Sequence, residues 1–72
     1  MKVNKTQALL YMYVTLMKKG HLIKSEIQSE LMINNLTFAR YIQELRAFFY
    51  NFYLDYDIEY NKKDDTYFLV EK

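Results

Sequence analysis

The sequence predicts an α+β fold in which three helices are followed by a two-stranded β-hairpin. Apolar residues recur with helical spacing over residues 5–19 and again over residues 35–50, and a shorter helical segment at residues 26–32 lies between them. From residue 57 the period changes, and branched and aromatic residues flank the polar tetrad KKDD. A chain of 72 residues has room for one hydrophobic core, so we expect a single domain spanning residues 1–72.

The first helix is predicted at residues 5–19. Its core-facing residues share helical spacing: Leu9, Tyr13, Leu16 and Met17. Gly20 can adopt the left-handed conformation that ends a helix. Three further apolar side chains fall on other faces of the helix: Leu10, Tyr11 and Val14. A single core contact does not need them, which predicts a surface for a partner.

The next two helices are predicted to be joined by a tight turn. In the segment SEIQ, Ser25 can cap the short second helix while the Gln28 side chain reaches back, which forms a capping box. Asn34 can then cap the third helix, and Asn51 can take the left-handed position that ends it. The core face of the third helix is Phe38, Ile42, Leu45 and Phe49.

The hairpin is predicted at residues 57–70, where the strands 57–61 and 66–70 flank a four-residue loop. That loop lacks glycine, so Asn61 or Asp65 has to carry any positive φ angle. Charged side chains that discourage further strand pairing are expected along one side of the first strand, as an exposed sheet edge. These residues are Asp55, Asp57 and Glu59.

Composition and spacing argue against catalysis and against a bound metal or cofactor. The chain has no cysteine and one histidine, so neither a disulfide, a thiolate metal site nor a histidine-rich zinc site is expected. It lacks a glycine-rich phosphate loop, a nucleophile beside a histidine, and an acidic pair that the fold would bury together. We therefore expect no enzyme activity, no metal and no cofactor, and we interpret His21 as a loop residue.

The N-terminal apolar run and the net charge bear on location and partners. Apolar residues between Ala8 and Met17 form too short a run to span a bilayer, and no small-residue cleavage site follows them. Together with the absence of cysteine, this predicts a cytoplasmic protein that does not bind membranes. The net charge of +1 gives no long-range attraction to a polyanion, so a DNA-binding surface has to come from local clustering.

The segment GHLIKSEIQSELMINNLTFARYIQELR resembles the helix-turn-helix segment of DeoR-type and biotin-repressor-type regulators, and of the N-terminal domains of WYL-type regulators. The matching positions are Ile33 before the cap, Asn34 in place of a capping serine, Thr37, Phe38, Arg40, Ile42 and Leu45. The segment DIEYNKKDDTYFLV resembles the wing of the same families, with Tyr67 and Leu69 matching a Tyr-x-Leu ending. The resemblance covers nearly the whole chain. It implies a winged helix-turn-helix domain that binds double-stranded DNA and regulates transcription.

The third helix then corresponds to the recognition helix, and its exposed face is expected to enter the major groove. That face is predicted as Asn35, Leu36, Thr37, Arg40, Tyr41 and Glu44. Asn35 can pair with adenine, Arg40 with guanine or a phosphate, and Leu36 can lie against a thymine methyl group. The hydroxyl groups of Thr37 and Tyr41 suit phosphate oxygens.

Three lysines are further candidates for phosphate contacts: Lys24 at the start of the second helix, and Lys62 and Lys63 at the hairpin tip. Asp64 and Asp65 follow directly and partly offset this attraction. A plain solvated turn at residues 62–65 is an equally good interpretation.

Two functions remain open. The leading hypothesis is a small DNA-binding regulator that acts by occupying its site. The second is a protein-interaction module, such as an antirepressor or assembly subunit, that uses Leu36, Tyr41 and surplus aromatic residues, because few charges line the third helix.

The segment AFFYNFYLDY has more aromatic surface than one helix face can bury. It predicts a homodimer through helix 1 and the end of helix 3, unless Phe48, Phe52 and Tyr53 fold under the hairpin and complete the monomer core.

Overall fold

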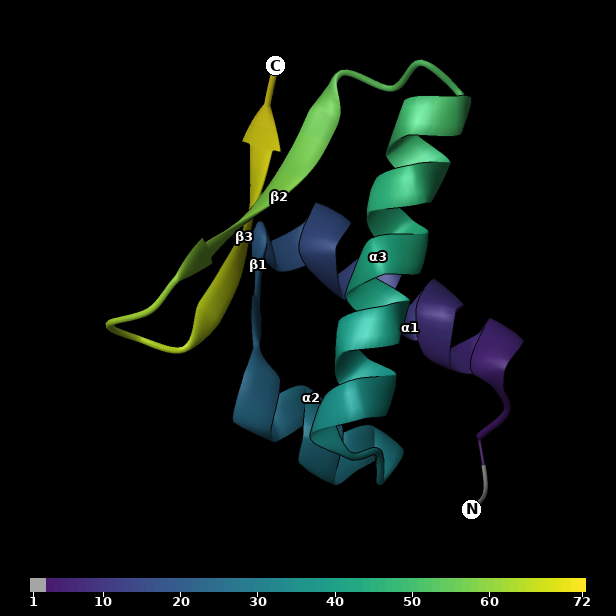
Figure 1. Cartoon of the computed structure of the whole chain (residues 1–72), viewed down its shortest axis with the longest axis vertical. Helices are drawn as coiled ribbons and strands as arrows, with labels where there is room; N and C mark the ends of the chain where they lie inside the picture. Colours follow the sequence, from purple (N-terminus) through teal and green to yellow (C-terminus); the bar gives the residue numbers. More distant parts are fainter. Residues whose placement is uncertain (1–2) are drawn as a thin grey trace.

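The computed structural model describes residues 3–72 and has the predicted α+β topology of three helices followed by an antiparallel hairpin (Figure 1). The elements in chain order are α1 (Lys5–Lys19), β1 (His21–Ile23), α2 (Lys24–Leu31), α3 (Asn35–Asn51), β2 (Tyr56–Asn61) and β3 (Thr66–Glu71). Within the described residues, no helix combines the length and the apolar character needed to cross a membrane.

The hairpin is part of a three-stranded antiparallel sheet with the strand order β1-β3-β2. In the hairpin, Ile58 lies opposite Leu69, and Tyr60 lies opposite Tyr67. The short strand β1 was not predicted, and our interpretation of His21 as a loop residue is wrong because it pairs with Phe68. A strand of three residues is too short for a periodic pattern, so it forms only because β3 offers an unpaired edge.

The hydrophobic core lies between α1, α3 and one face of the sheet. The buried cluster is Met12, Leu16, Leu22, Ile27, Phe38, Ile42, Leu45, Phe49 and Ile58. The predicted core face of α3 is confirmed in full. In α1 the buried stripe is Ala8, Met12 and Leu16, whereas Leu9, Tyr13 and Met17 are half-buried beside it. The first helix is therefore rotated slightly from the expected orientation.

Several predicted helix and turn positions are confirmed. Gly20 has a φ angle of 78° and ends α1, with its N–H donating to the carbonyl of Leu16. The side-chain oxygen of Asn34 accepts a hydrogen bond from the Thr37 N–H at the start of α3. In the hairpin loop, Asp65 carries the positive φ angle of 52°. Glycine, Asn and Asp tolerate or cap these positions for local reasons, which is why the sequence alone indicates them.

The start of α2 differs from the prediction. The helix begins at Lys24 directly after β1, so Ser25 lies inside the first turn and the expected capping box does not form. The Lys24 N–H donates instead to the carbonyl of Asp65 in the hairpin loop, at 3.3 Å. A backbone group distant in sequence replaces the side-chain cap, because the strand runs into the helix without a connecting loop.

Both α2 and α3 end with a left-handed residue that is not glycine. Met32 has a φ angle of 54°, and the Ile33 N–H donates back to the Gln28 carbonyl. At the end of α3, Asn51 is still helical and Tyr53 takes the left-handed position, so the prediction for Asn51 is wrong. The hydrogen bonds of these two ends, rather than the residue type, satisfy the last helical carbonyls.

The aromatic residues at the end of α3 and just after it do not all fold under the hairpin. Phe48, Phe52 and Tyr53 are all exposed, whereas Phe49 is buried and packs against the ring of Tyr56. The alternative in which the three exposed rings complete the monomer core is therefore wrong. The outer apolar residues of α1, Leu10, Tyr11 and Val14, are likewise exposed, as predicted.

Candidate nucleic-acid interface

The first two turns of α3 present side chains outward because Phe38 anchors the opposite face. The Phe38 ring is buried and lies 5.2 Å from the Tyr67 ring of β3. Asn35, Leu36 and Arg40 are exposed, and Thr37 is half-buried. The helix thus begins at a capped residue, rests on the hairpin through one aromatic pair, and leaves its outer surface open.

Asn35 has a second contact that sequence reasoning missed. Its Oδ1 atom accepts a hydrogen bond of 2.7 Å from Nε2 of Gln28, which ties α3 to α2. The bond orients the amide and leaves one lone pair of Oδ1 and both hydrogens of Nδ2 available. Bidentate pairing with adenine needs one acceptor and one donor, so the chemistry predicted for Asn35 is retained.

Two residues of the predicted exposed face have contacts within the monomer. Tyr41 is half-buried and packs against the core cluster, which leaves less of its surface for a ligand than the helical pattern alone indicates. Glu44 forms an ion pair with Lys5 of α1, with a distance of 3.3 Å between the charged atoms. The negative charge of this face is therefore compensated, and the positive charge of Arg40 is not.

The hairpin tip is organised by its own polar side chains and projects from the body of the molecule (Figure 1). Oδ1 of Asn61 accepts from the Lys63 N–H at 3.0 Å, and the Tyr60 hydroxyl donates to the carboxylate of Asp65 at 2.8 Å. This hydrogen bond raises the pKa of Tyr60. Lys62 and Lys63 are both exposed at the tip.

The fold brings the start of α2 beside the hairpin tip. The backbone hydrogen bond between Lys24 and Asp65 continues the pairing of β1 with β3 by one residue. Lys24 therefore lies next to the loop that contains Lys62 and Lys63. The pairing of β1 with β3 thus places Lys24 near the hairpin loop, which the sequence order did not show.

The charged side chains divide into paired and unpaired groups. Among residues 3–72, the ion pairs join Lys5 to Glu44, and Arg46 and Lys72 to Asp57. The four predicted DNA-contacting cations are in none of these pairs: Lys24, Arg40, Lys62 and Lys63. The positive charges left without a carboxylate partner thus include every cation of the predicted interface.

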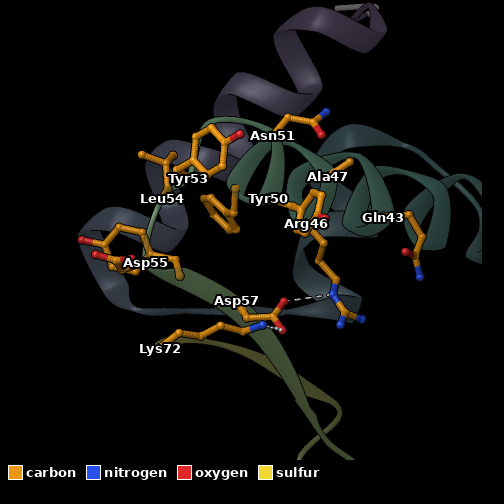
Figure 2. Close-up of a pocket in the computed structure, with 12 residues that line it drawn as sticks. Gln43, Arg46, Ala47, Tyr50, Asn51, Tyr53, Leu54, Asp55, Asp57 and Lys72 are labelled. Atoms are coloured by element: carbon orange, nitrogen blue, oxygen red, sulfur yellow. Dashed lines mark hydrogen bonds and ion pairs between the residues drawn. The ribbon is translucent and has the colours of Figure 1, made fainter.

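Asp57 is the centre of the paired group, and the prediction that it is an exposed edge charge is wrong. Its side chain is only 22% exposed, and Figure 2 shows Arg46 and Lys72 both pointing toward it. The Ile58 N–H, and then Arg46 and Lys72, hold the pKa of Asp57 below its ordinary value. These residues line an open hollow of about 740 Å³ between the end of α3 and the base of the hairpin, and it includes none of the predicted DNA-contacting residues.

The side chains of the candidate interface are of types that bind nucleic acids. Within the described part of the chain, no group of three or more histidine or acidic side chains is placed to hold a metal ion. The candidate interface offers unpaired cations, one amide and exposed apolar surface, and these are groups that recognise phosphates and base edges. In comparisons with known proteins, no family model, no curated protein and no solved structure matches the chain.

Proposed function

We propose that this chain is a winged helix-turn-helix domain similar to those of DeoR-type, biotin-repressor-type and WYL-associated regulators, and that it binds double-stranded DNA. In this proposal α3 enters the major groove and the hairpin contacts the sugar–phosphate backbone. The protein acts in the cytoplasm by occupying its site, as a repressor or an accessory factor in transcription.

The unpaired cations carry this proposal. Lys24 and the two tip lysines lie together at one end of the sheet, and Arg40 lies on the exposed face of α3. The other end of α3 has Arg46, which is neutralised by Asp57. In a chain with a net charge of only +1, the cations on the surface where the resemblance implies DNA are thus all outside its ion pairs.

The residues divide between positioning and base contact. Lys24, Lys62 and Lys63 are assigned to phosphates, together with the hydroxyl groups of Thr37 and the half-buried Tyr41. Asn35, Leu36 and Arg40 are assigned to base edges, because they are the exposed side chains of the first α3 turns. The hydrogen bond from Gln28 holds the Asn35 amide in one orientation, which favours a defined base contact.

A second candidate function is protein binding through the same end of the molecule. It is favoured by Met32 and Leu36, which are 85% and 62% exposed on either side of the α2–α3 turn. Exposed apolar side chains at such a turn suit a protein partner. An antirepressor or an assembly subunit is a partner protein of this kind.

Fluorescence anisotropy on mixed-sequence duplex DNA, measured at several salt concentrations, tests the leading proposal. Each phosphate contact contributes about 0.9 to the slope of log affinity against log salt. We expect the slope to correspond to roughly three or more phosphates per chain. Lys62→Ala should weaken binding and reduce the slope by about one, and Arg40→Ala should weaken binding.

Lys19→Ala is the matched control. Lys19 is exposed and outside every ion pair of residues 3–72, but it lies at the far end of β1 from Lys24. Its removal changes the net charge as much as the test variants do, and we expect the slope to stay the same. Absence of binding at low salt, or an equal loss in Lys19→Ala and Arg40→Ala, contradicts the proposed interface. In the first case, protein binding becomes the better candidate.

A further inference from the structure

An apolar surface on the outside of α1 and α3 stays uncovered in the described monomer. Its exposed side chains, which we call the α1–α3 patch, are Leu10, Val14, Phe48 and Phe52, with exposed fractions of 59%, 47%, 39% and 66%. The rings of Tyr13 and Phe48 lie 5.8 Å apart and join the two helices, and the rings of Phe48 and Phe52 lie 5.3 Å apart. The patch is therefore continuous from one helix to the other.

The patch has a hollow as well as ridges. A hollow of about 360 Å³ lies between the helices and is lined by Leu9, Leu10, Tyr13, Glu44, Leu45 and Phe48. Val14 and Phe52 do not line it and protrude beside it. A surface with both a hollow and protruding apolar side chains on the same face can fit another copy of itself.

The charges around the hollow also favour a second copy of this chain as the partner. The ionic groups at the hollow are Glu44, which lines it, and Lys5, which pairs with Glu44 at 3.3 Å. This rim carries one charge of each sign, so neither a strongly acidic nor a strongly basic partner is attracted. In a twofold arrangement the rim meets its own equivalent, and Lys5 of one copy can approach Glu44 of the other.

The apolar area matches what a stable dimer needs. With the exposed fractions above, four side chains of roughly 150–200 Å² each leave roughly 300–400 Å² of apolar surface in water. A standard interface buries about 800 Å² per partner, of which a little over half is apolar. The α1–α3 patch therefore supplies roughly the apolar part of one such interface.

We infer that a second copy of this chain covers the α1–α3 patch in an isologous, twofold dimer. Leu10 and Val14 of one copy pack toward the hollow of the other copy and toward its exposed α3 rings, Phe48 and Phe52. None of the cations assigned to DNA belongs to the patch, so dimerisation requires neither DNA nor the DNA-contacting residues. If DNA binds as proposed, the dimer presents two α3 helices to one duplex.

Sedimentation equilibrium over about 1–200 µM protein, without DNA, tests the dimer. The expected mass is twice the 8.9 kDa of the monomer at the upper concentrations. Leu10→Lys and Phe52→Lys each place a charge in the patch and should weaken association at least tenfold, because twofold symmetry then buries two lysine charges against apolar surface. Both positions are exposed, so the variants should keep the far-ultraviolet circular dichroism and the melting temperature of the monomer.

Tyr50→Lys is the control, since Tyr50 is 83% exposed on α3 but lines the hollow beside Asp57 instead. It should dimerise as the unmodified chain does. A monomeric mass across the whole range overturns the inference, as does a dimer that tolerates both patch substitutions. Masses that keep rising with concentration overturn it too, because they indicate a head-to-tail contact that does not close. The salt-dependent DNA titration is read separately on the same variants, so a failure of one proposal leaves the other standing.

Discussion

At the scale of single residues, one carboxylate joins three parts of the molecule. Asp57 accepts from the Ile58 N–H at 2.8 Å and from Nε of Arg46 at 3.0 Å, and it pairs with Nζ of Lys72 at 3.4 Å. These contacts connect the hairpin to α3 and to the end of the chain. Since each contact favours the charged carboxylate, they lower the pKa of Asp57, which links this site to stability.

We expect Asp57→Asn to lower the free energy of unfolding at neutral pH by about 0.5–1 kcal/mol, a modest figure because Arg46 and Lys72 are solvent-exposed. The folded pKa of Asp57 lies below its ordinary value of 3.8. Its contribution is therefore present above that value and is lost as the pH falls through the lowered pKa. Urea unfolding at a series of pH values should show the two stability curves converging in acid. A constant difference at every pH contradicts this role.

At the scale of elements, local chemistry sets some helix termini and not others. The predicted cap Asn34 is confirmed, whereas Met32 and Tyr53 take left-handed positions that usually favour glycine. A left-handed conformation costs a residue with a side chain roughly 1–2 kcal/mol. Hydrogen bonds and packing at the ends of α2 and α3 stabilise these two residues, and part of this stabilisation offsets the strain of their left-handed backbone.

Met32→Gly should therefore raise the free energy of unfolding by about 0.5–1 kcal/mol. Glycine removes the strain, and its larger entropy loss on folding offsets part of the gain. Met32 is 85% exposed, so little packing is lost with its side chain. Met32→Ala is the control, because it shortens the side chain and keeps the strained φ angle, and it should change stability little. Equal effects of the two substitutions in thermal or urea unfolding contradict the strain argument.

At the scale of the whole molecule, one core connects the helices to the sheet, and β1 is the link. Leu22 of β1 is 1% exposed in the core cluster, and its strand neighbours pair with β3. The backbone bond between Lys24 and Asp65 extends this link to the hairpin tip. The position of the tip lysines relative to α2 thus depends on the packing of a three-residue strand.

We expect Leu22→Ala to cost about 2–4 kcal/mol, from lost burial and the cavity left behind. That is a large part of the roughly 4–11 kcal/mol typical of a domain of this length. Far-ultraviolet circular dichroism, which follows the helices, and the backbone amide NMR signals of β2 and β3, which follow the hairpin, should shift together on heating. Ile23→Ala, at a half-buried neighbour, should cost less. If the β2 and β3 amide signals are lost before the helices melt in Leu22→Ala, the sheet and the helices do not share one cooperative core.

The sequence by itself determined the bounds of α1, the start and the buried face of α3, and the caps at Gly20 and Asn34. It also narrowed the left-handed residue of the hairpin loop to Asn61 or Asp65. Each of these depends on residues within a few positions of one another, where periodicity and local hydrogen bonding act directly. It also indicated which side chains on α3 and the hairpin tip suit DNA, since that follows from residue type.

Only the tertiary structure decided the rest. It revealed β1, moved the start of α2 to Lys24, and placed Lys24 beside the hairpin loop. It also showed that Asp57 forms ion pairs with Arg46 and Lys72. It also left Phe48 and Phe52 on the surface and not in the core. These features depend on contacts between residues far apart in the chain, and such contacts have no local pattern to predict them because their energy arises only when the core has brought the segments together.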